Sequence, residues 1–323
     1  MPADEEIPSL IENLTSRMRQ RANQFTGAVL VQTGPPQAAR WVGSGVRVEI
    51  TGRHFVATAA HVVDDGRPVL PTHGLGQDDW DRVERVWAGH HPLDVAWMEL
   101  TPGAGFRADE WLPLDCVGLA VGLPERDLLV LVLGYPGKYW VLNHEARTLT
   151  SEAICFPSST VSVAGVEGDH LVPVDLPPGH QLHGLGSTSE EVPAGWSRVF
   201  RALTQETDLM VPYPLDVLTR VPDGTAVAVE VPEPYGLSGG GVWAFGANPR
   251  RTSWRPEDGR LLGILRTYEA DGERCLHPQD AARHRPCGVL HATRVEHALR
   301  LLANSVEELR PAIEARLRQL ALT

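Results

Sequence analysis

The chain has 323 residues, a length that allows a sizeable core and two closely packed subdomains. Its formal net charge of −12 argues against a general phosphate-binding surface, which needs clustered lysine and arginine, so no nucleic-acid partner is expected. The sequence contains no run of about 18 apolar residues, and we therefore expect neither a transmembrane helix nor a membrane partner.

The N-terminal sequence and the cysteine content indicate in which cellular compartment the protein is expected. Residues 1–24 are charged and polar, and they lack the basic start, apolar stretch and cleavage site of a secretory signal. Four cysteines in a chain without such a signal favour free thiols in a reducing environment. We therefore expect a cytoplasmic protein.

Apolar residues at helical spacing over residues 5–23 predict an amphipathic helix, packed on the outside of the first half of the core. From Gly27 onward the pattern changes to short β-branched runs that are punctuated by glycine and proline, which is typical of strands. The strands predicted in this first half cover residues 27–32, 41–50, 54–63, 94–100 and 127–135.

The second half begins after a segment rich in glycine, proline, serine and aspartate, residues 157–200, which we interpret as a crossover plus an insertion. Helical spacing returns over residues 291–319, with a break near Pro311. This order favours an all-β core with terminal helices over a regular alternation of strands and helices. The strands predicted in the second half cover residues 208–213, 225–231, 240–245 and 260–268.

A histidine that could act as a general base lies near the end of the third predicted strand. His61 ends the stretch Thr58-Ala-Ala-His, and the small residues before it allow two backbones to approach closely. A lone histidine in such a place is more often structural, so further residues are needed to give it a role.

Two further motifs supply those residues. Asp94 stands directly before an apolar strand, where burial is costly unless a partner such as a histidine ring pairs with the carboxylate. Ser238 lies in Pro234-Tyr-Gly-Leu-Ser-Gly-Gly-Gly, and glycines around a serine permit a tight turn that aims backbone N–H groups at one point. Alone, Asp94 reads as a turn aspartate and Ser238 as part of a glycine-rich hairpin loop.

Taken together, these motifs occur in the order His, Asp, Ser, and with the Gly43-Ser44-Gly45 turn they resemble the trypsin-like (chymotrypsin-fold) serine peptidases, in the style of bacterial intracellular members. The resemblance covers roughly residues 27–270 and implies two six-stranded antiparallel β-barrels with N- and C-terminal helices. It divides the chain into an N-terminal helix (1–25), a first barrel (26–156), a crossover (157–200), a second barrel (201–290) and a C-terminal helical segment (291–323).

The resemblance also implies a mechanism without a cofactor. His61 would take the proton from Ser238 as the hydroxyl attacks a peptide carbonyl, and Asp94 would orient the imidazole. The amides of Gly236 and Ser238 would stabilise the oxyanion, and water would hydrolyse the acyl-enzyme. The expected partners are a protein or peptide substrate and a regulatory protein.

Several positions depart from the secreted members of this family. Leu237 stands where those enzymes have an aspartate that pairs with a new N-terminus, so activation by N-terminal trimming is not expected. Pro232, at the base of the expected substrate pocket, gives no support for a preference for arginine or lysine. Leu265, Arg266 and Thr267 would border the same pocket, with Arg266 replacing a small residue.

Three alternatives remain open at this point. The Gly236–Gly240 motif also matches the nucleophile elbow of α/β-hydrolases, which demands a helix after the serine. A catalytically latent or silent trypsin-like module could act as a binding or effector subunit of a larger system. Finally, two cysteines and two histidines that lie close together in the sequence could bind zinc, although residues spaced in this way more often belong to a solvated loop. These last residues are Cys275, His277, His284 and Cys287.

Overall fold

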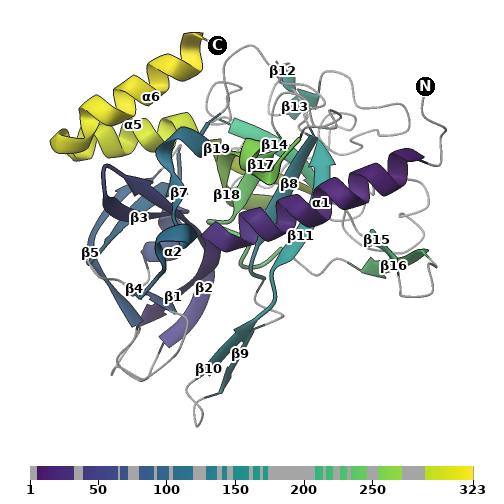
Figure 1. Cartoon of the computed structure of the whole chain (residues 1–323), viewed down its shortest axis with the longest axis horizontal. Helices are drawn as coiled ribbons and strands as arrows, with labels where there is room; N and C mark the ends of the chain where they lie inside the picture. The colour runs from purple at the N-terminus through teal and green to yellow at the C-terminus, as the bar shows by residue number, and fades with distance from the viewer. Residues whose placement is uncertain are drawn as a thin grey trace.

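The structure is a computed structural model of the chain, and its ribbon is drawn in Figure 1. It is mainly β, with two large sheets and a few helices. The residues that the structure describes are 6–32, 39–64, 66–71, 80–90, 93–101, 105–118, 129–136, 140–143, 148–159, 163–167, 170–173, 208–213, 216–220, 226–230, 234–245, 254–270 and 288–322.

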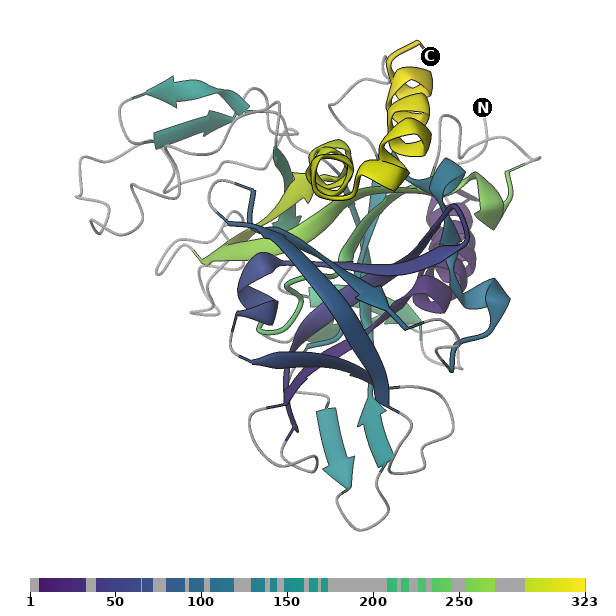
Figure 2. The same ribbon diagram turned by 90° about the vertical axis from the view of Figure 1, so that its left-hand side faces the viewer.

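The first sheet contains seven strands: β1 (Thr26–Gln32), β2 (Ala39–Ile50), β3 (Arg53–Thr58), β4 (Arg67–Pro71), β5 (Trp80–Gly89), β6 (Val95–Leu100) and β7 (Leu112–Pro113). Their order is β1-β4-β5-β6-β3-β2-β7, and β1 also pairs with β2. Because β1 has strand neighbours on both sides, the sheet curls round on itself, as Figure 2 shows. All its pairings are antiparallel except the short one between β2 and β7.

The second sheet contains six strands: β8 (Leu129–Gly134), β11 (Ile154–Ser159), β14 (Asp208–Tyr213), β17 (Gly241–Ala244), β18 (Arg260–Ala270) and β19 (Gly288–Arg294). They pair antiparallel in the order β11-β8-β17-β18-β19-β14. Three separate two-stranded units complete the β structure: β9 (Trp140–Asn143) with β10 (Thr148–Ser151), β12 (Val163–Glu167) with β13 (His170–Pro173), and β15 (Asp216–Arg220) with β16 (Ala226–Glu230).

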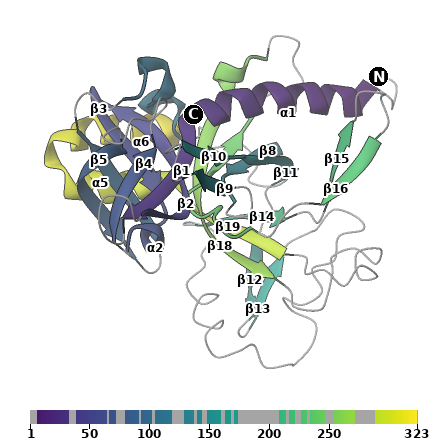
Figure 3. The same cartoon turned by 90° about the horizontal axis from the view of Figure 1, so that it is seen from below.

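The helices are α1 (Glu6–Phe25), α2 (Ala60–Val63), α5 (Val295–Ser305) and α6 (Arg310–Leu322), with 3₁₀ turns at Ala108–Glu110, Leu114–Cys116, Pro256–Asp258 and Glu307–Leu309. The helix predicted over residues 5–23 is confirmed as α1. It does not cover the first sheet alone, because Phe25 at its end stacks on Trp243 of β17, with ring centroids 6.2 Å apart. Figure 3 shows α1 extending from the first sheet past β8 and β11 of the second.

Apolar side chains fill three regions of the core. One cluster lies within each sheet, and the largest lies between the sheets and under α1 and α5. In that shared cluster Trp97 of β6 is fully buried, and its indole N–H donates to the main-chain oxygen of Ala298 in α5 at 2.7 Å. Because this cluster contains side chains from both sheets, the two sheets form one packed unit.

Most of the predicted strands are present, and three boundaries differ from the sequence division. The strand predicted over residues 54–63 ends at Thr58, and residues 60–63 form the short helix α2, whose buried alanine packs against the core. The strand β8 lies within residues 26–156 but pairs with β17, so it belongs to the second sheet. Residues 291–294, predicted to be helical, form the end of β19, and the helix begins only at Val295. In this stretch His291 and Thr293 pair with β14 and β18, and tertiary pairing overrides the local helical spacing.

Within the described ranges, no helix is long and apolar enough to cross a membrane.

Candidate active site

The position of His61 follows from the end of β3. Thr58 is the last residue of this strand, and its hydroxyl donates to the main-chain oxygen of Ser44 at 2.7 Å. Ala59 and Ala60 are fully buried, so the short helix α2 can start directly against the core. His61 is the second residue of that helix, and 47% of its side chain is exposed. The alanines therefore place a solvent-accessible imidazole on a rigid base.

Asp94 binds His61 with both carboxylate oxygens. Oδ2 of Asp94 lies 2.8 Å from Nδ1 of His61, and Oδ1 accepts the main-chain N–H of His61 at 3.0 Å. Asp94 has a φ of +45°, a left-handed conformation that aspartate tolerates better than most residues, and its N–H donates to the main-chain oxygen of His90 at 3.0 Å. This turn directs the carboxylate towards α2, where it fixes the imidazole ring from one side.

Two glycines with positive φ shape the loop that carries Ser238. Gly236 has a φ of +93° and Gly239 a φ of +86°. A Cβ atom at Gly239 would overlap the main-chain oxygen of Ser44 and the hydroxyl of Thr58, so a glycine is required there for both conformation and space. The loop therefore lies directly against β2 and the end of β3.

Gly43 of β2 separates Ser238 from the helix that carries His61. A Cβ atom at Gly43 would lie 2.7 Å from the main-chain oxygen of Ser238 and 2.7 Å from Cγ2 of Val62, the residue after His61. The absence of a side chain at Gly43 thus lets both the serine loop and α2 pack closely against β2 at this point. The structure brings His61, Asp94 and Ser238 into one region.

The hydroxyl of Ser238 donates to the main-chain oxygen of Arg266 at 3.0 Å. In the described part of the chain, neither the Gly236 N–H nor the Ser238 N–H donates a hydrogen bond. Among the described residues both amides thus lack an acceptor, and a carbonyl oxygen that develops negative charge is an acceptor that such a pair can stabilise. The neighbouring Leu237 N–H is already used, because it donates to the main-chain oxygen of Pro234 at 3.0 Å.

The side chain of Arg266 is buried in the second sheet. Its Nη2 atom lies 2.5 Å from Oδ1 of Asp208 on β14, and both side chains are at most 6% exposed. The register between β18 and β19 shifts between Leu265 and Thr267, so Arg266 is the extra residue of a β-bulge. The guanidinium charge is compensated inside the protein by this ion pair.

The other residues predicted to border a substrate pocket are distributed differently. Leu265 is buried in the core of the second sheet, and its backbone binds the serine loop through Gly239 and Gly240. Thr267 lies on β18 opposite His291. Pro232 lies outside the described residues, as do the four candidate zinc ligands Cys275, His277, His284 and Cys287.

Two cysteines and one tyrosine near the shared core have shifted pKa values. Burial raises the pKa of Cys155 to about 12, and burial also raises the pKa of the Cys116 thiol. Both thiols are therefore protonated and poorly nucleophilic at neutral pH. Burial likewise raises the pKa of Tyr135, whose phenol donates to Oδ1 of Asn23 at 2.8 Å.

No protein-family model matches the chain, and no curated protein is significantly similar to it.

Ser44 is the residue of the site that the sequence left without a role. The Gly43-Ser44-Gly45 stretch was interpreted as a turn although it falls within the strand predicted over residues 41–50, and it lies inside strand β2. A serine between two glycines within an otherwise β-branched strand is the signal that could have identified it, because small residues mark a place where another backbone packs closely. Ser44 is fully buried against the Ser238 loop.

Proposed function

We propose that the chain is a serine endopeptidase of the trypsin-like type, with His61, Asp94 and Ser238 as its triad. The observation that carries this proposal is the double hydrogen bond from the Asp94 carboxylate to His61, beside a loop that presents a serine hydroxyl and two available amides. A carboxylate on Nδ1 fixes the imidazole tautomer whose Nε2 atom can accept a proton. The reaction that we propose for these residues is the hydrolysis of peptide bonds.

In the proposed reaction the Ser238 hydroxyl turns from Arg266 to His61 and attacks the carbonyl carbon of the substrate. Nε2 of His61 takes the hydroxyl proton, and the Gly236 and Ser238 amides stabilise the oxyanion. The imidazolium then donates its proton to the leaving amine, which departs and leaves an acyl-enzyme. Water, deprotonated by His61, hydrolyses the ester and restores Ser238.

The arrangement of strands supports the same family. The first sheet links six antiparallel strands from β1 back to β1, and the second sheet also has six antiparallel strands. Two six-stranded barrels of the chymotrypsin type are the finer architecture that we propose on this basis. The strand β17 directly follows Ser238, which is against the helix that an α/β-hydrolase requires at this place.

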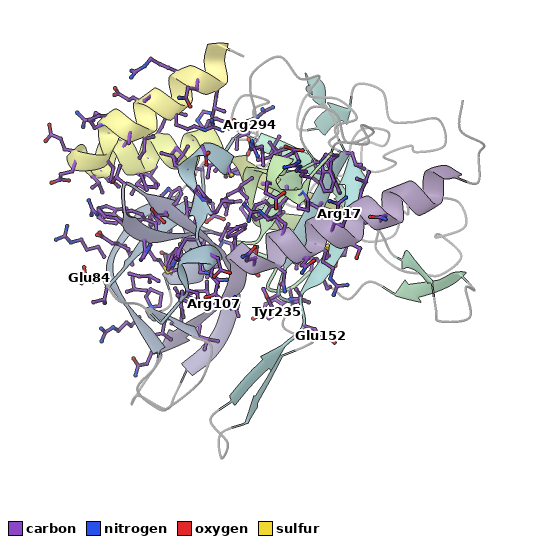
Figure 4. All side chains as sticks on the ribbon, viewed as in Figure 1. Arg17, Glu84, Arg107, Glu152, Tyr235 and Arg294 are labelled. Carbon is purple, nitrogen blue, oxygen red and sulfur yellow. The ribbon has the colours of Figure 1, made fainter. Side chains whose placement is uncertain are left out.

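An exposed aromatic side chain next to the nucleophile is the contact that we propose for a peptide substrate. Tyr235, one residue before Gly236 and labelled in Figure 4, is 72% exposed. Exposed aromatic side chains beside a reactive group commonly contact a bound polypeptide, since they bury a large area at low entropic cost. Because Arg266 is paired with Asp208, we do not expect its charge to take part in substrate recognition.

One contact favours a second candidate function, a latent or silent module of the same fold. The hydrogen bond of the Ser238 hydroxyl goes to the main-chain oxygen of Arg266, an arrangement that must change before attack. A regulatory partner that shifts β18 would release the hydroxyl and activate the enzyme. A module that never releases it would serve as a binding or effector subunit.

The test is the cleavage of a complex peptide mixture, followed by mass spectrometry of the new termini. We expect the wild type to cut peptide bonds and to show a preference at the position before the cut. The variants Ser238→Ala and His61→Ala should lose this activity, whereas His90→Ala should keep it. His90 is the matched control because its imidazole also faces an aspartate, Asp64, at 3.6 Å on the exposed surface. Cleavage that persists in Ser238→Ala would rule out the proposed nucleophile.

A further inference from the structure

Ser44 connects the first sheet to the loop of the proposed nucleophile through its backbone and its side chain. Its main-chain N–H donates to the main-chain oxygen of Ser238 at 2.7 Å, and its hydroxyl donates to the main-chain oxygen of Gly236 at 2.9 Å. The same hydroxyl accepts the N–H of Tyr135, just after β8, at 2.8 Å. The main-chain oxygen of Ser44 accepts the Thr58 hydroxyl. All polar groups of this buried residue are thus engaged around the site.

Two peptide groups of the loop, separated by one other peptide, are each held by hydrogen bonds at the carbonyl oxygen and at the N–H. In the Gly236–Leu237 peptide, Ser44 binds the carbonyl and Pro234 accepts the N–H at 3.0 Å. In the Ser238–Gly239 peptide, Ser44 again binds the carbonyl, and the N–H donates into strand β18. A peptide group that is fixed at its oxygen and at its nitrogen cannot rotate without breaking both bonds.

The peptide groups that supply the two available amides lie next to these fixed groups. The Gly236 N–H belongs to the Tyr235–Gly236 peptide, which directly precedes the fixed Gly236–Leu237 peptide. The Ser238 N–H belongs to the Leu237–Ser238 peptide, which lies between the two fixed peptides. The carbonyl of this middle peptide accepts the Gly240 N–H at 2.7 Å. Since neighbouring peptide planes share a Cα atom, fixing alternate planes restricts where the remaining N–H groups can point.

We propose that Ser44 is the positioning residue of the oxyanion hole, an assignment that rests on the proposed peptidase function. It does not touch the substrate; it orients the Gly236 and Ser238 amides by holding the carbonyls beside them. Its hydroxyl must both donate and accept here, which alanine cannot do.

The experiment compares Ser44→Ala and Ser44→Cys with the wild type in the full chain. The readout is the rate constant for adduct formation at Ser238 with a fluorophosphonate, whose P=O oxygen occupies an oxyanion hole. We expect Ser44→Ala to react about 10 to 100 times more slowly, a smaller loss than the roughly 10²- to 10³-fold that removal of one oxyanion donor costs, because both amides remain present. Ser44→Cys, which keeps a weak donor and acceptor, should be intermediate. With a peptide substrate the loss should appear in kcat rather than in KM.

The matched control is Ser305→Ala, which removes an exposed hydroxyl that also binds a main-chain oxygen, that of Leu301, at 2.8 Å. It should react at the wild-type rate. Equal rates for the wild type and both Ser44 variants would overturn the assignment of Ser44 and leave the peptidase proposal standing.

Crystal structures of the wild type and Ser44→Ala separate the two proposals if the wild type does not react at all. That result removes the peptidase function, while the role of Ser44 in the loop is still decided by the structures. We expect the Gly236 carbonyl to turn away from residue 44 when the hydroxyl is replaced. A loop with unchanged peptide orientations would contradict the positioning role.

Discussion

Asp94 contacts His61 at two places, the ring atom Nδ1 at 2.8 Å and the main-chain nitrogen at 3.0 Å. One carboxylate thereby fixes both the start of the helix α2 and the orientation of the imidazole ring. A side chain held in this way needs little reorganisation during a proton transfer, which is the main advantage of a preorganised base. The exposed fraction of the Asp94 side chain is 22%, so the pair is shielded from water only in part.

The first prediction concerns Asp94→Asn. The amide keeps the size of the carboxylate but stabilises the wrong imidazole tautomer, so kcat/KM should fall by about 10³- to 10⁴-fold. The melting temperature should change little, because the pair is partly exposed. The matched control is Asp64→Asn, since Asp64 lies 3.6 Å from His90 in an exposed pair and should not affect activity. Peptide hydrolysis by the two variants checks the prediction; equal activities would contradict the role of Asp94.

A second prediction concerns Gly239→Ala. The new methyl group would meet the main-chain oxygen of Ser44 and the Thr58 hydroxyl, and φ is +86°. The loop must therefore move, with a loss of activity and a destabilisation of about 2 kcal/mol or more. Gly52→Ala is the control because φ is +76° there and no atom lies within 4 Å of the new methyl group. It should cost only about 1 kcal/mol in urea-induced unfolding and should keep full activity.

Tyr235 is the subject of a third prediction. Replacing this exposed residue by alanine should raise KM for long peptides by roughly 10-fold, which corresponds to the loss of an aromatic contact. The labelling of Ser238 by a small fluorophosphonate should not change, because such a reagent is too short to reach a separate subsite. Tyr235→Phe should restore most of the affinity. A KM unchanged in Tyr235→Ala would show that this ring does not contact substrate.

The fourth prediction concerns the pH dependence of stability. Burial raises the pKa of Glu296 in α5 and outweighs the lowering by Arg294, His297 and Arg300. The folded state therefore binds the Glu296 proton more tightly than the unfolded state, and its stability decreases as the pH rises from the unfolded value towards the folded one. Glu296→Gln should melt above the wild type near about pH 8, with the difference shrinking towards about pH 4. A constant difference across this range would contradict the burial argument.

Local patterns allowed a large part of the fold to be predicted. The helix α1, the strands that flank the site and the three candidate triad residues each follow from a few neighbouring residues, whose spacing and chemistry are visible in one window. The strand β5 was missed, because its alternation includes several charged residues and a short glycine-rich segment precedes it.

Long-range relationships could not be predicted in the same way. The ion pair between Arg266 and Asp208 joins β18 to β14, two strands with β19 between them, and nothing near Arg266 in the sequence indicates an acidic partner. The role of Ser44 likewise depends on carbonyl groups about 190 residues away, and backbone groups leave no trace in side-chain patterns. The pairing of β8 with β17, rather than with a strand of the first sheet, is likewise a long-range relationship that local patterns do not predict.

The most direct test of the central claim is the reaction of the purified chain with a fluorophosphonate, with the adduct mapped by mass spectrometry. We predict a single adduct on Ser238, absent in Ser238→Ala and strongly slowed in His61→Ala. Cys155 should not compete, because burial raises its pKa to about 12 and keeps that thiol protonated. A wild-type chain that remains unlabelled at Ser238 would contradict an assembled triad and oxyanion hole.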